Sequence, residues 1–158
     1  MTTEWNPDIV ADEIKRFLRS KGGESEITTI VTFDEHGVSD HPNHKAVHFG
    51  AKKVQEGEDY PVDVLTLSTV NMCRKYMSYG DIMNLDPFDW HFINFDFGYV
   101  LRAMSCHASQ FVWYRKLFIA FSRYSWVSSF KYHEHPKSKR TRENKLEAEK
   151  EDKAKSLG

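Results

Sequence analysis

Several features that define large protein classes are missing from this sequence. Its 158 residues contain no run of about 18 apolar residues, so we expect no transmembrane helix. The first residues, Met1–Pro7, carry no apolar core of the kind found in signal peptides. Two cysteines, Cys73 and Cys106, are too few for a disulfide framework. They favour a reduced, cytosol-facing environment.

An excess of one charge is also missing. Lysine and arginine total 22, and aspartate and glutamate total 23. Because nucleic-acid-binding domains usually carry a basic excess, we expect no nucleic-acid partner. The chain is long enough for one domain with a modest core. What it has in quantity is aromatic side chains, which make up 14 % of the residues and are concentrated between residues 92 and 130.

The first half of the chain predicts two strands joined by a helix. Asn6–Pro7 is typical of a helix start, and Gly22–Gly23 would end that helix. Residues 27–33 predict a strand buried on both faces, and residues 62–67 predict a second apolar strand. Between them, Pro42 begins a helix that runs to about residue 55. The expected fold class is therefore α/β, a partial Rossmann-like three-layer domain with parallel strands.

The second half predicts less regular structure. Residues 70–77 indicate a short helix, and residues 91–97 indicate a third strand. Residues 98–132 predict one long helix, with breaks near Ser105 or Ser125.

The last residues form a compositional region of their own. Residues 133–158 are nearly all polar or charged, so we expect a solvated tail that is disordered or helical at 145–154. Its basic start is either part of that solvated extension or a patch that lies next to a membrane.

The most informative stretch is residues 34–44. It places His41 and His44 three residues apart, which puts both rings on one face of a helix. One interpretation is a helix start that Asp40 or His41 caps. The other is a metal ligand beside a catalytic imidazole, brought together because Gly37 can take a positive φ.

Two histidines do not make a catalytic zinc site. Such a site uses three protein ligands, an open position and a carboxylate base. Asp34 and Asp40 are near enough in sequence to serve as the base, but their spacing selects neither. His48 fits a residue that supports the site or lies on the helix surface better than it fits a ligand. His36, which lies in the loop, fits either interpretation.

Residues 32–44 resemble a hallmark of the N-acetylglucosaminyl-phosphatidylinositol de-N-acetylases. These enzymes catalyse the second step of GPI-anchor biosynthesis and belong to the LmbE-like (PIG-L) zinc deacetylases. Three further stretches are similar to the family in the same order. They are Asp63–Leu67 with Val70–Asn71 and Arg74–Tyr76, then Ala103-Met-Ser-Cys-His107-x-Ser109-Gln110, then Trp113–Tyr124. The resemblance covers roughly Trp5 to Phe130.

The resemblance implies zinc-dependent hydrolysis of the sugar acetamide. The position of His44 is a zinc ligand in that family. The position of His41 is an imidazole that steadies the tetrahedral oxyanion and protonates the departing amine. Asp34 is then expected to orient the loop or one of the rings. His107 either lines the substrate site or is a core histidine.

One motif of the family is missing from this sequence. A His-Pro-Asp-Asp-Glu motif supplies the family's other two zinc ligands and its base. The resemblance implies that residues 1–132 are the C-terminal portion of an LmbE-like domain without its first strands. We therefore expect the chain alone to lack a complete zinc site and deacetylase activity. Asp40 replaces a glycine and Ala108 a common arginine. The first change should perturb the loop, because aspartate accepts a positive φ less readily than glycine.

The aromatic segment at residues 111–130 has two interpretations. It carries Arg115, Lys116 and Arg123, and the last two are seven residues apart, so they should share a helical face. Aromatic and basic side chains together suit a membrane surface, where a cation could meet the inositol phosphate of the substrate. The alternative is a core helix whose cationic side chains reach out to water.

The expected function is de-N-acetylation of the glycolipid N-acetylglucosaminyl-phosphatidylinositol, with Zn²⁺ as cofactor. The resemblance places this reaction at the cytosolic face of the endoplasmic reticulum membrane. The alternative is a non-catalytic remnant that binds a membrane surface or a partner. The sequence indicates no particular oligomeric state.

Overall fold

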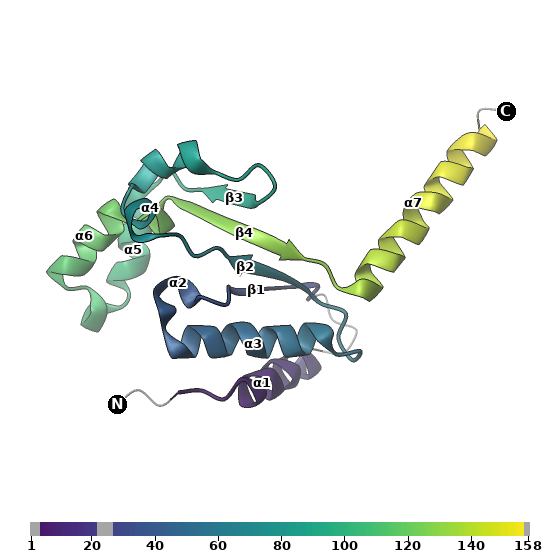
Figure 1. Cartoon of the computed structure of the whole chain (residues 1–158), viewed down its shortest axis with the longest axis horizontal. Coiled ribbons are helices and arrows are strands. Elements are labelled where there is room, and N and C mark those ends of the chain that lie inside the picture. The colour runs from purple at the N-terminus through teal and green to yellow at the C-terminus, as the bar shows by residue number, and fades with distance from the viewer. Residues whose placement is uncertain (1–3, 22–26, 157–158) are drawn as a thin grey trace. The chain divides into compact units, whose positions relative to one another are not determined.

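The computed structural model describes residues 4–21 and 27–156. It contains helices and a four-stranded mixed sheet with strand order β1-β2-β4-β3 (Figure 1). β1 and β2 are parallel, and β3 and β4 are antiparallel. The parallel pair, joined through a helix, confirms the predicted α/β class. The strands are β1 (Thr29–Phe33), β2 (Asp63–Leu67), β3 (Trp90–Ile93) and β4 (Val127–His133).

The chain forms two compact units, and β2 and β4 each run from one into the other. The first unit lies within Met1–Thr66 and Tyr132–Gly158, and the second is Leu67–Lys131. The helices of the first unit are α1 (Pro7–Ser20), α2 (Gly37–Asp40), α3 (Pro42–Glu56) and α7 (Pro136–Ser156). Those of the second are α4 (Met72–Lys75), η1 (Ser78–Asn84), α5 (Phe97–Ser105), η2 (Ala108–Gln110), α6 (Trp113–Phe121) and η3 (Arg123–Ser125).

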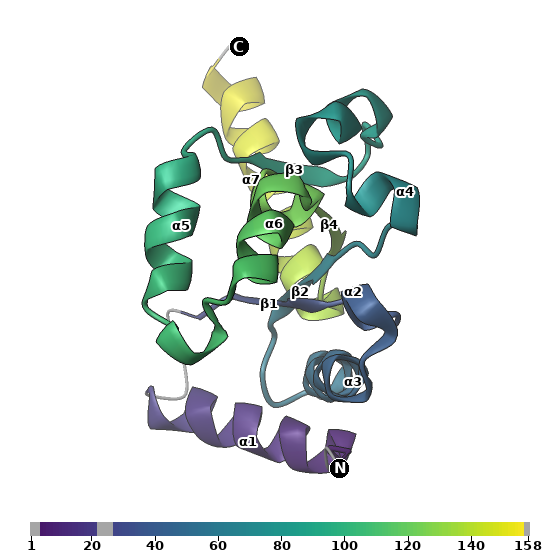
Figure 2. The ribbon, with the colours of Figure 1, turned by 90° about the vertical axis from the view of Figure 1, so that its left-hand side faces the viewer.

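In the first unit α1 packs across α3. Figure 2 views α3 nearly end-on and shows α1 running across it. Gly50 lies at this contact, where a Cβ would be only 2.6 Å from Cγ1 of Val10. The small residue therefore allows the close approach of the two helices. At the start of α1, the Asn6 side chain accepts a hydrogen bond from the Asp8 N–H, which confirms the predicted helix start. Gly22–Gly23, predicted to end this helix, lie outside the described residues.

The apolar core of the first unit centres on one cluster, whose buried members are Ala11, Leu18, Val54 and Val62. Ala46, Ala51 and Val64 of the same unit are buried as well. Each fully buried Leu or Val contributes about 1.5–3 kcal/mol relative to an exposed position. Partly buried neighbours complete the cluster: Ile14, Ile27, Ile30 and Tyr60.

Residues after position 131 return to complete the first unit. The Gln55 side chain donates to the His133 carbonyl oxygen at 2.6 Å. Oδ1 of Asp63 accepts the His135 N–H at 2.8 Å, and Nδ1 of His135 accepts the Lys137 N–H at 3.1 Å. These contacts fix the last strand and the first turn of α7.

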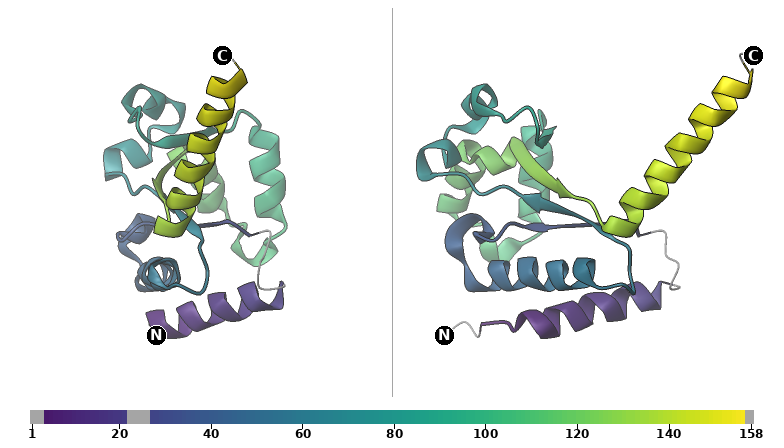
Figure 3. Two further views of the ribbon diagram at one scale, coloured as in Figure 1. Left: turned by 90° about the vertical axis from the view of Figure 1, so that its right-hand side faces the viewer. Right: turned by 45° about the vertical axis from the view of Figure 1, so that its right-hand side comes forward.

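The α7 helix is longer than the sequence suggests. The composition predicts disorder or a helix at 145–154, whereas α7 is one continuous helix over Pro136–Ser156 (Figure 3). The division of the chain at residue 132 stays a prediction. Along the two described ranges, no helix combines the length and apolarity that crossing a bilayer requires.

The second unit is arranged around Trp126. Its indole N–H donates to the Ala120 carbonyl oxygen at 3.0 Å. The rings of Tyr79 and Phe97 have centroids 4.4 and 5.3 Å from it. The adjacent β3–β4 pair is antiparallel, with Ile93 opposite Val127. Aromatic packing of this kind adds about 0.5–1.5 kcal/mol per pair beyond simple burial.

The prediction of one long helix over 98–132 is wrong. The chain forms α5, η2, α6 and η3 in succession, and residues 127–133 are strand β4. The break at Ser105 is where α5 ends. In β4 the burial alternates, with Val127 and Ser129 buried and Ser128 and Phe130 less so, which is the two-residue period of a strand. Aromatic and β-branched residues favour strands as well as buried helices, and that ambiguity caused the error.

The prediction that β1 is buried on both faces is also wrong. Val31 is 62 % exposed, while its neighbour Thr32 is buried. β1 is the edge strand of the sheet, and α3 packs against it. An edge strand covered on one face alternates buried and exposed side chains.

Candidate functional site: a histidine loop between β1 and α3

The loop that follows β1 is held by Asp34. Oδ1 of this carboxylate accepts hydrogen bonds from the Gly37 N–H at 3.0 Å and the His36 N–H at 3.2 Å. The Asp34 side chain is buried, so these bonds form with little competition from water. The Asp34 carboxylate thus ties the loop together through these two hydrogen bonds.

The backbone of this loop is unusual. Gly37, Val38 and Asp40 all have positive φ, at 60°, 64° and 59°. Only glycine adopts such angles without cost, and a β-branched residue such as valine adopts them rarely. Asp40 stands where the resembling family has glycine, and its backbone takes the conformation that glycine would favour.

His44 is held from two sides at the start of α3. Its Nδ1 lies 2.9 Å from the Gly37 carbonyl oxygen, so Nδ1 carries the proton and donates it. The ring also stacks on Phe33 with a centroid distance of 4.1 Å. Among the described residues Nε2 of His44 has no hydrogen-bond partner, so this atom keeps its lone pair available.

His41 caps the same helix. Its Nδ1 accepts the Asn43 N–H at 3.2 Å, so the helix-start interpretation is confirmed. The two interpretations do not exclude each other, because the ring centroids of His41 and His44 are 5.0 Å apart. With Nδ1 used as an acceptor, the neutral His41 ring carries its proton on Nε2, which can act as a hydrogen-bond donor.

The other two histidines of this region have different surroundings. His48 is buried, and its Nδ1 donates to the Phe33 carbonyl oxygen at 2.8 Å, which ties α3 to β1. His36 is exposed and lies 3.9 Å from Glu35.

Asp40 forms an exposed ion pair with Lys45 on α3. The hydrogen bond from Lys45 and its positive charge lower the pKa of the Asp40 carboxyl. The carboxylate is thus ionised at neutral pH, and it faces a lysine rather than either histidine.

The fit of this site to a zinc ion is partial. His44, with Nδ1–H fixed and Nε2 open, has the form of a histidine ligand whose second nitrogen is bonded to a carbonyl. The described part of the chain, however, gathers no three His, Cys, Asp or Glu side chains in a position to share a metal. These residues supply one histidine ligand and not a complete three-ligand site.

The remaining predicted site residues belong to the second unit. His107 is exposed, after the end of α5. Arg115 and Lys116 lie on α6 and are exposed, and the Lys116 ammonium is 4.9 Å from the centroid of the Phe111 ring. Arg115 also lines a cavity of about 420 Å³ with Tyr76, Tyr114, Leu117, Phe118 and Phe121.

The expectation that Lys116 and Arg123 share a helical face is wrong. The α6 helix ends at Phe121, and Ser122 begins the short helix η3. The Arg123 side chain is completely buried, and its Nε lies 2.5 Å from Oδ2 of Asp81. A cation in this environment pairs with a buried carboxylate instead of reaching out to a surface.

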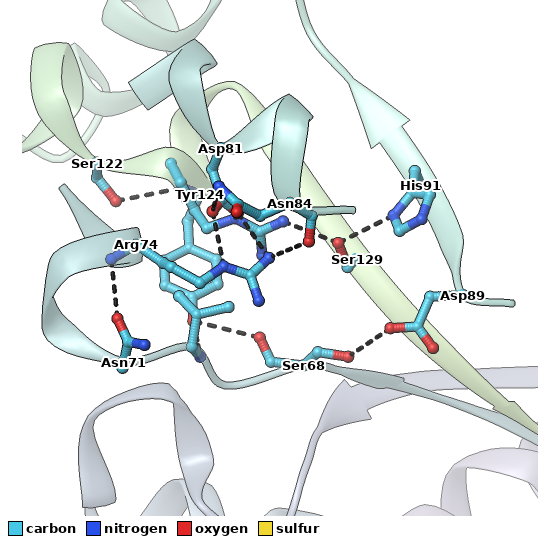
Figure 4. A network of polar contacts seen from close by, with 12 residues as sticks. Ser68, Asn71, Arg74, Asp81, Asn84, Asp89, His91, Ser122, Tyr124 and Ser129 are labelled. Carbon is cyan, nitrogen blue, oxygen red and sulfur yellow. Dashed lines mark hydrogen bonds and ion pairs between the residues drawn. The ribbon is translucent and has the colours of Figure 1, made fainter. Parts of the chain in front are cut away.

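Asp81 is the residue that sequence reasoning missed. It is completely buried and accepts two hydrogen bonds from Arg74, at 2.7 and 3.0 Å, so two guanidinium groups share one carboxylate (Figure 4). Burial lowers the pKa of Arg123, whereas the hydrogen bond to Asp81 raises that of Arg74. The available signal was the presence of two arginines, Arg74 and Arg123, within stretches that resemble the family.

Comparison with known proteins gives three informative relatives. The chain is 37 % identical to "N-acetylglucosaminyl-phosphatidylinositol de-N-acetylase" of Bos taurus, over 81 % of this chain and 51 % of that protein. It is 34 % identical to the "Probable N-acetylglucosaminyl-phosphatidylinositol de-N-acetylase" of Schizosaccharomyces pombe, over 78 % and 52 %. A probable enzyme of the same name from Dictyostelium discoideum is 26 % identical, over 82 % and 62 %.

The chain thus spans about half the length of the first two of these relatives. No protein-family model matches the chain, and no solved structure matches it significantly.

Proposed function

Because this chain belongs to the N-acetylglucosaminyl-phosphatidylinositol de-N-acetylase family, we propose that it serves the hydrolysis of N-acetylglucosaminyl-phosphatidylinositol to glucosaminyl-phosphatidylinositol and acetate. The observation that carries the proposal is the pairing of His41 and His44, whose ring centroids are 5.0 Å apart. Nε2 of His44 keeps an open lone pair, whereas His41 can carry a proton. Amide hydrolysis needs both a group that binds the metal and a group that donates a proton.

His44 is the metal-binding residue in this proposal. The Gly37 carbonyl fixes its tautomer, and stacking on Phe33 fixes its ring plane, so Nε2 is presented to a zinc ion in one orientation. Zinc, when bound, supplies Lewis-acid polarisation of the acetamide carbonyl. Among the described residues, no group of three His, Cys, Asp or Glu side chains completes a zinc site with His44.

His41 carries the proton in this proposal. In the neutral ring Nδ1 accepts the Asn43 N–H, so Nε2 carries the proton and the ring is held in one orientation. Gain of a second proton at Nδ1 breaks this bond and gives the imidazolium. The imidazolium would stabilise the negative charge that develops on the acetamide oxygen and then give its Nε2 proton to the departing amine. Asp34 acts indirectly, because it holds the loop that places Gly37 against His44.

The membrane surface is the proposed partner of the second unit. On α6 the side chains of Trp113, Tyr114 and Leu117 are exposed beside Arg115 and Lys116. Rings at headgroup depth and cations beside anionic phosphates would both be well solvated in that position. We place the reaction at the cytosolic face of the endoplasmic reticulum membrane, where the glycolipid substrate would be presented to the site.

A chimera tests the catalytic proposal. In the Bos taurus relative, the segment that this chain matches is replaced by this chain, and release of acetate from N-acetylglucosaminyl-phosphatidylinositol is measured. We expect the chimera to be active and His44→Ala to reduce its rate by at least about 100-fold, in the range of a lost metal or acid–base group. His41→Ala should have a comparable effect on kcat.

A matched control is His36→Ala, which removes an exposed imidazole from the same loop. It should leave the rate within about twofold. An active chimera whose rate is unaffected by His44→Ala would refute the assignment of the site.

A further inference from the structure

A small polar cavity of about 190 Å³ lies in the second unit, beside the buried Arg74–Asp81–Arg123 cluster. Figure 4 shows Arg74, Asp81 and Asn84 gathered close together, with Ser68 and Asp89 joined by a hydrogen bond nearby. We call it the Arg123 cavity. Its lining is Ser68, Thr69, Val70, Arg74, Asn84, Asp86, Asp89, Arg123, Ser129 and Lys131.

The cavity lining carries charges of both signs. Arg74 and Arg123 share the single carboxylate of Asp81. Lys131 lines the same cavity, is exposed and forms no ion pair within the described ranges. Asp86 and Asp89 line the same cavity, so the lining offers cationic donors and carboxylate acceptors side by side.

Arg123 also has an unused donor. Its Nη2 donates to Oγ of Ser129 at 2.8 Å, and its Nε lies against Asp81. Its Nη1 is buried and has no hydrogen-bond partner within the described part of the chain. A buried guanidinium nitrogen without a partner is uncommon in native structures, and a ligand oxygen would satisfy it.

The surrounding hydrogen bonds hold Arg123 in place. Nε2 of His91 lies 2.6 Å from the Asp86 carbonyl oxygen and therefore carries a proton. Nδ1 of His91 can then accept the Ser129 hydroxyl proton, at 2.9 Å, which leaves the hydroxyl oxygen free to accept from Arg123. The donors that line the cavity are thus fixed before any ligand arrives.

The two carboxylates in the lining argue against a site for a bare anion. Asp86 and Asp89 each use one oxygen locally, Asp86 with the Phe88 N–H and Asp89 with the Ser68 hydroxyl. Their other oxygens can accept hydrogen bonds from hydroxyl groups. The volume, equal to roughly six water molecules, admits one small ring and not an oligosaccharide.

We propose that the Arg123 cavity binds a small polyol phosphate, with Arg74, Arg123 and Lys131 as donors to the phosphate oxygens. Asp86 and Asp89 accept hydrogen bonds from the polyol hydroxyls. The identification of the polyol as inositol rests on the function proposed above, whereas the recognition of a phosphorylated polyol rests on the cavity alone.

Isothermal titration of the purified chain tests this inference with three probes: myo-inositol 1-phosphate, inorganic phosphate and myo-inositol. We expect saturable 1:1 binding of the first, weaker binding of the second and none of the third. Lys131→Gln should weaken binding of inositol phosphate about tenfold, as loss of one charge-assisted contact predicts. Lys139→Gln is the matched control, because this exposed lysine on α7 makes the same charge change outside the cavity.

A second variant separates the two halves of the ligand. Asp89→Asn should weaken binding of inositol phosphate and leave or improve that of inorganic phosphate. Circular dichroism of each variant verifies that it is folded. If no phosphate binds saturably, or if Lys131→Gln binds as tightly as the parent chain, the inference is overturned. Equal affinity for inorganic phosphate and inositol phosphate would overturn the polyol half and leave an oxyanion site.

Because the titration needs no catalysis, its outcome is independent of the proposed reaction. A chain that binds inositol phosphate, while the chimera remains inactive, would refute the proposed function alone. An active chimera with no phosphate binding by the chain would refute the cavity assignment alone.

Discussion

Gly37 and His44 are in such close contact that a Cβ on Gly37 would lie 2.8 Å from Cβ of His44. The same glycine takes φ = 60° and offers its carbonyl oxygen to the His44 ring. The residue without a side chain and the residue proposed to bind zinc are thus a single structural unit. The imidazole can stay in this position only while residue 37 remains a glycine.

Gly37→Ala should therefore destabilise the loop. The left-handed backbone costs an alanine roughly 1–2 kcal/mol, and the contact with His44 adds to this cost. We expect the free energy of unfolding in urea to fall by about 2 kcal/mol or more. Gly80→Ala is the control, since the nearest atom to its added Cβ would be 3.7 Å away. Equal effects of the two substitutions would show that the close contact is not maintained in solution.

The Asp40–Lys45 pair predicts a pH dependence. Lys45 lowers the pKa of the Asp40 carboxyl below its ordinary 3.8. Because the folded-state pKa is depressed, the stabilisation is present above about pH 4 and is lost as the pH falls through the lowered pKa. In a carbon-13 NMR titration, Lys45→Gln should move the midpoint of Asp40 upward. Lys52→Gln, on the same helix, should leave it unchanged, and a fixed midpoint in both variants would contradict the pairing.

Removal of the Asp81 charge should be severe. Asp81→Asn leaves two guanidinium groups without a counter-ion, and breaking a buried ion pair costs roughly 3–5 kcal/mol. Asp96→Asn is the matched control, because its pair with Arg102 is exposed and such pairs contribute less than about 1 kcal/mol. Urea unfolding followed by tryptophan fluorescence measures both. Comparable losses would mean that the buried cluster is hydrated in solution.

Docking through α6 should depend on its two cations. Arg115→Gln with Lys116→Gln should weaken binding to anionic vesicles by about 30-fold, at about 1 kcal/mol for each cation near the surface. Co-sedimentation with phosphatidylserine-containing liposomes measures the effect. Lys139→Gln with Arg140→Gln on α7 makes an equal charge change and should alter binding much less. If the α7 pair has the larger effect, the basic start of that helix is the docking segment.

The single histidine ligand predicts weak zinc binding by the chain alone. One imidazole without two further ligands cannot form a structural or catalytic site of ordinary affinity. After dialysis at neutral pH, the purified chain should retain far less than one zinc per molecule by atomic absorption. Stoichiometric zinc that His44→Ala removes would refute this expectation.

The sequence predicted those elements whose end signals are local. Asn6–Pro7 and His41 fix the starts of α1 and α3 by side-chain hydrogen bonds that involve residues two positions away. The strand β4 and the edge position of β1 depend on pairing with distant segments, which no local pattern contains. The long helix over 98–132 was the resulting error.

At the site, the residues were predictable and their arrangement was not. The positive φ at Val38 could not be inferred, because a β-branched residue argues against it. Arg123 looked like a surface cation because its partner, Asp81, is 42 positions earlier and outside any recognised motif. The roles of His41, His44, Asp34, His107, Arg115 and Lys116 stay predictions.

The first unit is discontinuous in the chain, and this determines when it can be completed during synthesis. Asp63 and Gln55 find their partners His135 and His133 only after the whole of Leu67–Lys131 has been made. At a synthesis rate of about 5–20 residues per second, Asp63 and Gln55 remain without these partners for several seconds. During that interval the Asp63 carboxylate lacks the hydrogen bond from the His135 N–H, and the edge of β2 that will pair with β4 is unpaired. The second unit must therefore be synthesised before the first unit can finish folding.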